Sequence, residues 1–247
     1  MFLVVLLTGV TSLQGQTTAA PPAEKLTFEK LVKATKITLR DSAELPLEMK
    51  VSLTTSDPAG RIRKEKTGSY KLDFHGFNVQ SSRGKVTFRG GWSTRNAAFN
   101  SALFFLVPAI VVAHTDGDRY RFDITEASET NPYVGLKATA ISACQFEWAD
   151  RQFPQHFCGP MNLEFNKDDL SLIHYLFEGA GLPIETNVDP FGKSTLLGYR
   201  MEVDFQTTLL PGDPKPFLIP KRSVTTIETN KGKVVINTAY ALREKKK

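Results

Sequence analysis

The chain has little of what catalytic and metal centres are built from, because its 247 residues include only two cysteines and four histidines. The histidines are His75, His114, His156 and His174. They show neither an HExxH motif nor another metal-ligand spacing, and no GxSxG elbow surrounds Ser93. Gly192-Lys193-Ser194 resembles the end of a phosphate-binding loop, but Asn187 stands where that motif requires its first glycine. We therefore expect no enzyme, no cofactor and no bound metal.

The chain also carries little net charge. The formal net charge is +5, and residues 243–247, with four basic side chains and one acidic, supply +3 of it. We interpret this segment as a basic tail on a nearly balanced body, which argues against a nucleic-acid-binding surface. A second basic run, from Arg61 to Lys66, contains no aromatic residue, so we expect a solvated loop or an edge strand there.

Charge is missing altogether at the N-terminus, where no charged residue precedes Glu24. Phe2–Val10 is an apolar run followed by small and polar residues. A run of this length is typical of a secretory signal peptide and too short to cross a membrane. We predict a signal peptide over residues 1–15, with a short buried strand as the alternative. The mature protein is then expected in the periplasm or secreted, without a transmembrane segment.

Two details of this export signal stay open. Cleavage after Gly15 is favoured over cleavage after Ala19, and residues 16–25 are expected to form a flexible leader. The basic residues that usually open a signal peptide are missing. Either the true start lies upstream of Met1, or the signal is atypical.

The two cysteines are interpreted in the light of export. Cys144 and Cys158 form the only possible pair, and an even count in an oxidising compartment favours a disulfide. Closing a loop of about 15 residues would stabilise the fold by roughly 3 kcal/mol. The competing interpretation joins these thiols with His156 as metal ligands, but a structural zinc site needs a fourth ligand.

Alternating apolar and polar residues recur along the body of the chain. Each run offers one face to bury and one to solvate, which is the pattern of strands in an antiparallel sheet. The runs are Leu47–Thr54, Tyr70–Phe74, Lys85–Arg89, Arg119–Ile124 and Tyr199–Phe205.

Two segments depart from this alternation. Leu26–Ile37 has apolar residues at mostly three-to-five spacing, which predicts an amphipathic helix. Ala97–Ala113 is almost wholly apolar, too short to span a bilayer, and interrupted by Pro108. As a helix from about Arg95 to Leu106 it must be buried on most sides. It would either cover a sheet as part of a solid core or line an apolar cavity.

A polar run, Asn166–Asp169, follows the strand expected over Met161–Phe165. We predict a turn there, leading into a second strand over Leu170–Phe177, with a helix as the alternative. The residues expected on one side of that strand are Leu170, Leu172, His174 and Leu176.

Prolines concentrate between Pro211 and Pro220, where an extended loop is expected. A hairpin follows it, with strands over Lys221–Glu228 and Lys233–Tyr240 joined by an Asn-Lys-Gly turn.

This order of segments from Met161 to Tyr240 resembles the outer-membrane lipoprotein carrier (LolA-like) superfamily. The resemblance rests on strand order and turn chemistry, and it extends loosely to the exported N-terminus, the first helix and the apolar segment. The insertion that carries Cys144 and Cys158 departs from a minimal carrier.

The resemblance implies a curved antiparallel sheet, an incomplete barrel, with helices closing an apolar cavity that receives acyl chains. We therefore predict one α+β domain over residues 26–242, in which an N-terminal helix and a central apolar helix cover the sheet. The residues expected to line the cavity are Phe99, Leu103, Phe104, Leu106, Tyr199, Met201, Val203 and Phe205.

The predicted function is an exported, non-enzymatic binder or carrier of lipid acyl chains or lipidated proteins. Each buried methylene contributes roughly 0.8 kcal/mol, so such a function needs no polar motif. The alternative is an exported structural or interaction module with a solid core. An apolar cavity of roughly 300 Å³ or more would favour the carrier.

Overall fold

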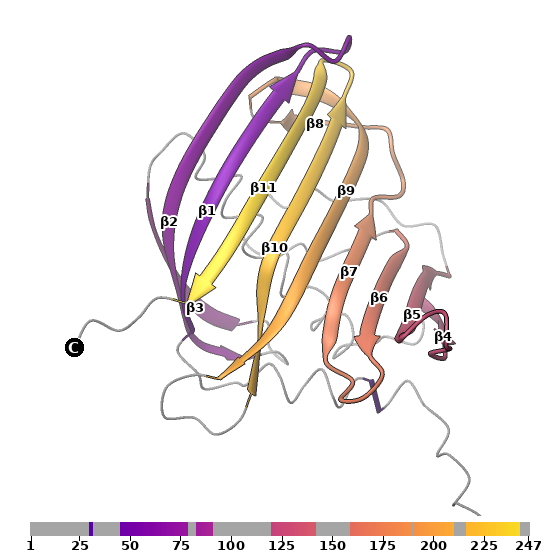
Figure 1. The fold of residues 1–247 in the computed structure, drawn as a ribbon. Helices are drawn as coiled ribbons and strands as arrows, with labels where there is room; N and C mark the ends of the chain where they lie inside the picture. Colours follow the sequence, from indigo (N-terminus) through magenta and orange to yellow (C-terminus); the bar gives the residue numbers. More distant parts are fainter. Residues whose placement is uncertain are drawn as a thin grey trace, which may run out of the picture.

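The structure, a computed structural model, describes residues 30–31, 45–78, 83–90, 120–141, 159–188, 190–209 and 216–242. Within these ranges the chain forms an 11-stranded antiparallel sheet (Figure 1). The strands are β1 (Leu45–Ser56), β2 (Ile62–Asn78), β3 (Arg83–Gly90), β4 (Tyr120–Thr125), β5 (Tyr133–Ala140), β6 (Met161–Asn166), β7 (Leu172–Glu178), β8 (Ile184–Val188), β9 (Gly192–Leu209), β10 (Pro216–Thr229) and β11 (Gly232–Leu242).

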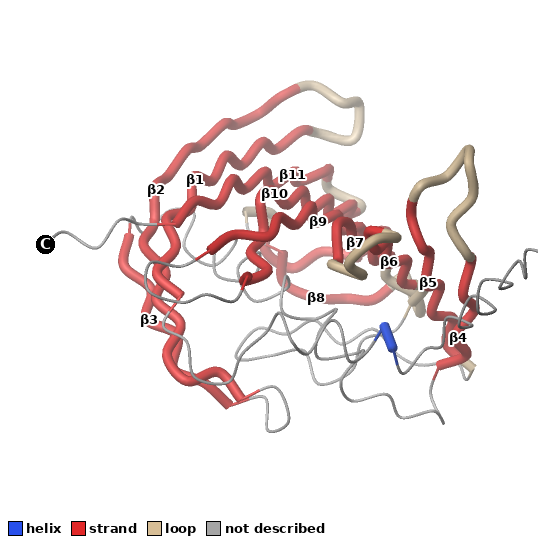
Figure 2. Tube along the Cα trace, turned by 60° about the horizontal axis from the view of Figure 1, so that its bottom comes forward, coloured by secondary structure: helices blue, strands red, loops and turns tan. Residues whose placement is uncertain are grey.

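The sheet formed by the described strands is open, since β3 and β4 end the strand order β3-β2-β1-β11-β10-β9-β7-β6-β5-β4 and do not pair with each other. The long strands bend together, and Figure 2 shows the sheet as an arch with β8 on its concave side. β8 pairs with residues 192–196 of β9, while β7 pairs with residues 200–204 of the same strand. Thus β9 has hydrogen-bonded ladders with β10, β8 and β7.

The predicted α+β class is wrong for the part of the chain that the structure describes, which is almost entirely β-sheet. Of the helix expected over Leu26–Ile37, only Lys30 and Leu31 are described; these two are helical, and Leu31 is fully buried. The segment Ala97–Ala113 lies outside the described residues. Most of the described residues belong to strands, and buried and more exposed side chains alternate along β11 and most of β9. No helix in the described ranges has the length and apolar character needed to cross a membrane.

Register places the buried residues of neighbouring strands side by side on the concave face, which we call the inner face. Two cross-strand rows run from β1 to β4 through paired positions. The first row is Val51, Thr238, Ser223, Val203, Tyr175, Leu163, Leu136 and Ile124; the second is Leu53, Ile236, Thr225, Met201, Phe177, Met161, Ala138 and Phe122. The period of two thus builds one continuous buried layer.

The turn and second strand predicted after Phe165 are confirmed, and the helix alternative is wrong. The predicted face is wrong, however, because Tyr175 and Phe177 are the fully buried residues of β7. Phe165 pairs with Leu172 but Glu164 pairs with His174, so one extra residue lies in β7 at this point. This bulge turns the side chains after it to the opposite face.

The proline-rich loop is shorter than predicted, because β10 already begins at Pro216. The register between β10 and β9 shifts between Pro220 and Arg222. Proline has no N–H to donate to a ladder, so an irregularity at this position is expected. The hairpin of β10 and β11 that follows is confirmed.

The turn between β1 and β2 is organised by Asp57. Its carboxylate accepts hydrogen bonds from the Arg61 backbone N–H at 2.9 Å and from Arg61 Nε at 3.1 Å, and Arg63 Nη2 lies 2.9 Å away. After Arg61, the basic run continues into the half of β2 that, among the described strands, pairs with β1 alone, while β3 pairs from Tyr70 onward. Of the two expectations, the edge strand is confirmed. Charged side chains on such an edge oppose pairing with another chain.

Asp57 makes the stability of this turn depend on pH. The Arg61 N–H, assisted by the two guanidinium groups and opposed by burial, holds the pKa of Asp57 below its ordinary value of 3.8. A lowered folded-state pKa gives stability that is complete above the unfolded pKa and is lost as pH falls through the folded one. We expect Asp57→Asn to unfold at lower urea than the wild type at pH 6, with the difference shrinking below about pH 4. A difference that is constant with pH would contradict this.

The turn between β10 and β11 depends on Gly232, whose φ is +140°. A Cβ at this position would lie 2.0 Å from the Ser56 carbonyl oxygen and 3.1 Å from the Phe191 ring. Thr229 Oγ1 donates a hydrogen bond to the Gly232 carbonyl oxygen at 2.9 Å. Only glycine therefore fits both the backbone conformation and the space.

Gly60 offers a matched control, since its φ is +80° but no described atom lies within 4 Å of the place that a methyl group would take. We expect Gly232→Ala to lower the free energy of unfolding by about 3–5 kcal/mol, and Gly60→Ala by about 1–2 kcal/mol. Urea denaturation measures both. Equal losses would show that the close approach of Ser56 to Gly232 is unimportant.

Candidate functional site

The predicted lining residues of β9 lie together on the inner face. Tyr199, Met201, Val203 and Phe205 are all buried, and Met201 and Val203 are completely inaccessible to solvent. Their alternation with Arg200, Glu202 and Asp204 directs them to one side of the longest strand. Because β9 lies in the middle of the sheet, these residues occupy the centre of the inner face.

The remaining predicted lining residues lie outside the described part of the chain. They are Phe99, Leu103, Phe104 and Leu106. Cys144 and Cys158 also lie outside it, as do the signal peptide, the leader and the basic tail. Their roles stay predictions.

Aromatic side chains that the sequence analysis missed extend this apolar centre. Tyr175 and Phe177 of β7 are fully buried, as is Phe165 of β6. The rings of Phe177 and Tyr199 meet edge to face, with centroids 5.9 Å apart and planes inclined by 63°. The alternation of Tyr175 and Phe177 could have revealed these positions, but the bulge at the start of β7 shifts the pattern onto the wrong residues.

Four hydroxyl side chains interrupt the apolar inner face on β10 and β11. We call Ser223, Thr225, Thr238 and Tyr240 the hydroxyl cluster; each has at most 5% of its surface exposed. Ser223 Oγ and Tyr240 Oη are 3.0 Å apart in a hydrogen bond. Burial raises the pKa of Tyr240, and the hydrogen bond with Ser223 opposes that rise. Tyr240 is therefore a neutral hydroxyl at physiological pH.

The sequence could not easily reveal the hydroxyl cluster. In the middle of β10 the buried positions are Ser223 and Thr225, while the apolar Val224 between them lies on the outer face, with its side chain half-buried. Over these three residues hydropathy alone would point to the opposite face. Only the register against Val203 and Thr238 fixes the inward direction of Ser223.

The outer face carries a row of polar and charged side chains across β7, β9 and β10. Asp204 Oδ1 lies 2.8 Å from His174 Nδ1, and Asp204 Oδ2 lies 3.0 Å from Arg222 Nη2. Paired register positions hold the three residues side by side. Among the residues described, no group of three or more His, Cys, Asp or Glu side chains is arranged to hold a metal ion. The row links the strands by charge and hydrogen bonding.

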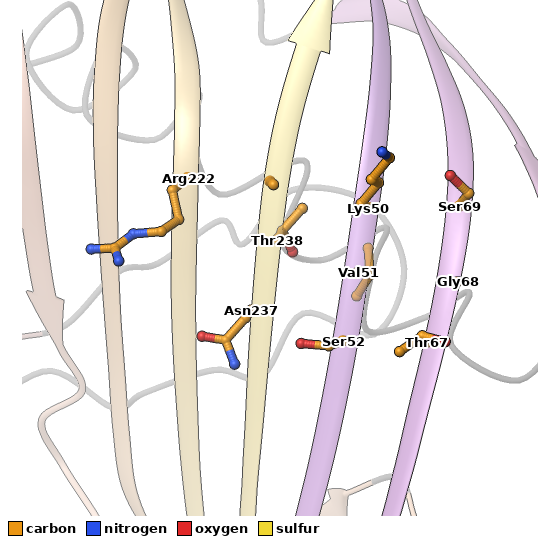
Figure 3. A pocket seen from close by; sticks show the side chains of 10 residues that line it. Lys50, Val51, Ser52, Thr67, Gly68, Ser69, Arg222, Asn237 and Thr238 are labelled. Atoms are coloured by element: carbon orange, nitrogen blue, oxygen red, sulfur yellow. The ribbon is translucent and has the colours of Figure 1, made fainter.

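A hollow of about 570 Å³ lies over β1, β2, β10 and β11 (Figure 3). The residues that line it are Lys50, Val51, Ser52, Thr67, Gly68, Ser69, Arg222, Asn237, Thr238 and Ala239. Lys50, Ser52 and Ala239 alternate along their strands with the buried Val51 and Thr238, so the hollow lies on the outer face. It is therefore not the apolar cavity that the sequence analysis predicts on the inner face.

Comparison with known proteins gives matches in solved structures alone, since no family model and no curated protein matches the chain. A LolA superfamily protein from Nitrosomonas europaea aligns over 90% of this chain and 96% of its own, with 14% identity and a TM-score of 0.37. A DUF1329 family protein from Desulfovibrio piger covers 89% and 93%, with 9% identity and a TM-score of 0.41. A domain named for outer membrane lipoprotein sorting, from Vibrio parahaemolyticus, covers 90% and 95%, with 9% identity and a TM-score of 0.36.

Two of these three structures bear names from the superfamily that the order of segments in the sequence resembles. Identities of 14% or less and TM-scores of 0.41 or less transfer no residue and no ligand to this chain.

The central position of Met201 gives a test of the inner face. Its side chain is fully buried, whereas Gln206 on the same strand is exposed. We expect Met201→Ala to lower the free energy of unfolding by about 2–5 kcal/mol, because it leaves a cavity. Gln206→Ala is expected to change it by about 0.5 kcal/mol or less. Equal effects of the two variants in urea denaturation would contradict the assignment of the inner face.

Proposed function

We propose that the protein is an exported, non-enzymatic carrier that binds acyl chains of lipids or lipidated proteins against the inner face. The observation that carries this proposal is the buried layer formed by the two cross-strand rows, which is apolar except for the hydroxyl side chains of β10 and β11. It passes through the centre of an open sheet, at Met201, Val203 and Phe177. An acyl chain needs such a surface, and it needs no catalytic group.

Simple transfer energetics support the proposal. Burial of each methylene contributes roughly 0.8 kcal/mol, so an apolar face alone can supply useful affinity. The aromatic rings of Tyr175, Phe177 and Tyr199 add large apolar surfaces at the middle of this face. The resemblance of Met161–Tyr240 to lipoprotein carriers agrees with the same function.

A second candidate function has a specific observation in its favour. Phe165, Tyr175 and Phe177 are completely buried in the structure, as they would be in a solid core. On this account the protein is an exported structural or interaction module without a small-molecule ligand. The two functions differ in whether an acyl chain can occupy the space over the inner face.

Binding of acyl chains of increasing length separates the two functions. The probes are saturated fatty acyl esters of 10, 12, 14 and 16 carbons, which compete with a fluorescent acyl probe for the purified protein. We expect affinity to rise by about fourfold for each added methylene until the site is filled. Mass spectrometry of lipid extracted from gently purified protein is expected to show a bound acyl lipid.

The solid-core alternative makes opposite predictions for both measurements. Absence of extracted lipid, together with no competition at any chain length, would overturn the carrier function. Weak binding that does not depend on chain length would likewise show that methylene groups are not buried in a site.

A further inference from the structure

The hydroxyl cluster lies in the middle of the inner face, where binding of an acyl chain alone would require only apolar side chains. Thr225 is paired with Met201 of β9 on one side and Ile236 of β11 on the other. Ser223 is paired with Val203 and Thr238. The hydroxyls are therefore in the middle of the inner face and not at its rim.

Within the hydroxyl cluster, the hydroxyl of Thr225 lacks a hydrogen-bond partner in the described part of the chain. Only 3% of its surface is exposed, and its Oγ1 atom is buried without a hydrogen-bond partner among the residues that the structure describes. A buried hydroxyl without a partner destabilises the fold, so a bound group that completed its hydrogen bonding would stabilise the complex. The Oγ–H group can donate one hydrogen bond and accept two.

The surroundings select the kind of group that can complete this hydrogen bonding. None of the buried residues in the described ranges is Lys, Arg or His, so a carboxylate at Thr225 would be buried without a compensating cation. A neutral carbonyl oxygen needs only a donor, which Thr225 can supply. Met201 and Ile236 on either side can contact the hydrocarbon next to that carbonyl.

We propose, on the basis of the proposed function, that Thr225 is a specificity-determining residue that donates a hydrogen bond to the ester carbonyl of a bound acyl chain. Ser223 and Tyr240, already joined at 3.0 Å, provide a polar border beside it. The ligand class is thus an acyl ester, and an alkyl ether or a free carboxylate binds less well. The same ester occurs in a phospholipid and in the diacylglyceryl group of a lipidated peptide.

The test compares ligands that differ in the carbonyl alone. Vesicle-free binding is measured with a short-chain diester phosphatidylglycerol and with its diether analogue of equal chain length. A second arm uses a diacylglyceryl-cysteine peptide and its dialkyl ether counterpart, which distinguishes the two ester sources. We expect the diester to bind about two- to tenfold more tightly than the diether in at least one arm.

Two variants test whether the preference for diester over diether depends on Thr225. Thr225→Val keeps the shape of the side chain but removes the hydroxyl, and it is expected to bind diester and diether equally. Thr226→Val, at the neighbouring position on the outer face, is the control and is expected to keep the preference. Removal of an unpaired buried hydroxyl is also expected to leave the thermal midpoint of the ligand-free protein unchanged or raised.

The possible failures are distinguishable. Binding of neither diester nor diether overturns the proposed function and this inference with it. Equal binding of both by the wild type overturns the inference alone, and so does a preference that survives in Thr225→Val. If Thr225→Val does not fold, the wild-type comparison and Thr225→Ser, which keeps a hydroxyl and is expected to keep the preference, decide the question.

Discussion

The register between neighbouring strands is the constraint on which the rest of this structure depends. Side chains alternate along each strand, so a buried layer forms only where every strand presents its apolar residues at paired positions. Val51, Val203 and Leu136 belong to one such row although they are far apart in sequence. The open sheet, its inner face and the candidate binding site all follow from this alignment.

The sequence was most informative where alternation was clean. It placed β1 and the centre of β9 correctly, although β9 extends from Gly192 to Leu209, beyond the predicted Tyr199–Phe205. It also directed Met201 and Val203 inward, because their polar neighbours leave one choice of face. It failed at β7, where one extra residue inverts the pattern, since a bulge is a property of two paired strands. The α+β class failed because it assumed that two apolar segments form helices that cover the sheet. The described residues of the chain form strands almost entirely.

The two faces of β9 and β10 have different chemistry. Outside, Asp204 joins His174 to Arg222, and such exposed interactions are weak individually. Inside, the hydroxyl cluster was not predicted, because serine and threonine are residue types that are mostly exposed and nothing local marks Ser223 and Thr225 as buried. Burial changes the energetics of these side chains. A hydroxyl on the surface forms hydrogen bonds with water, whereas the same hydroxyl within an apolar layer costs free energy unless a specific partner accepts or donates a hydrogen bond.

The division of one edge of β9 between β8 and β7 has a consequence for how the sheet assembles. Residues 192–196 and 200–204 are held by different partners on that edge, while β10 holds the opposite edge along nearly the whole strand. A slip of β9 by one residue would therefore break three ladders together and turn Met201 and Val203 outward. A register shift in β9 therefore cannot be confined to one pair of strands. The register of the strands on both sides of β9 depends on the position of this one strand.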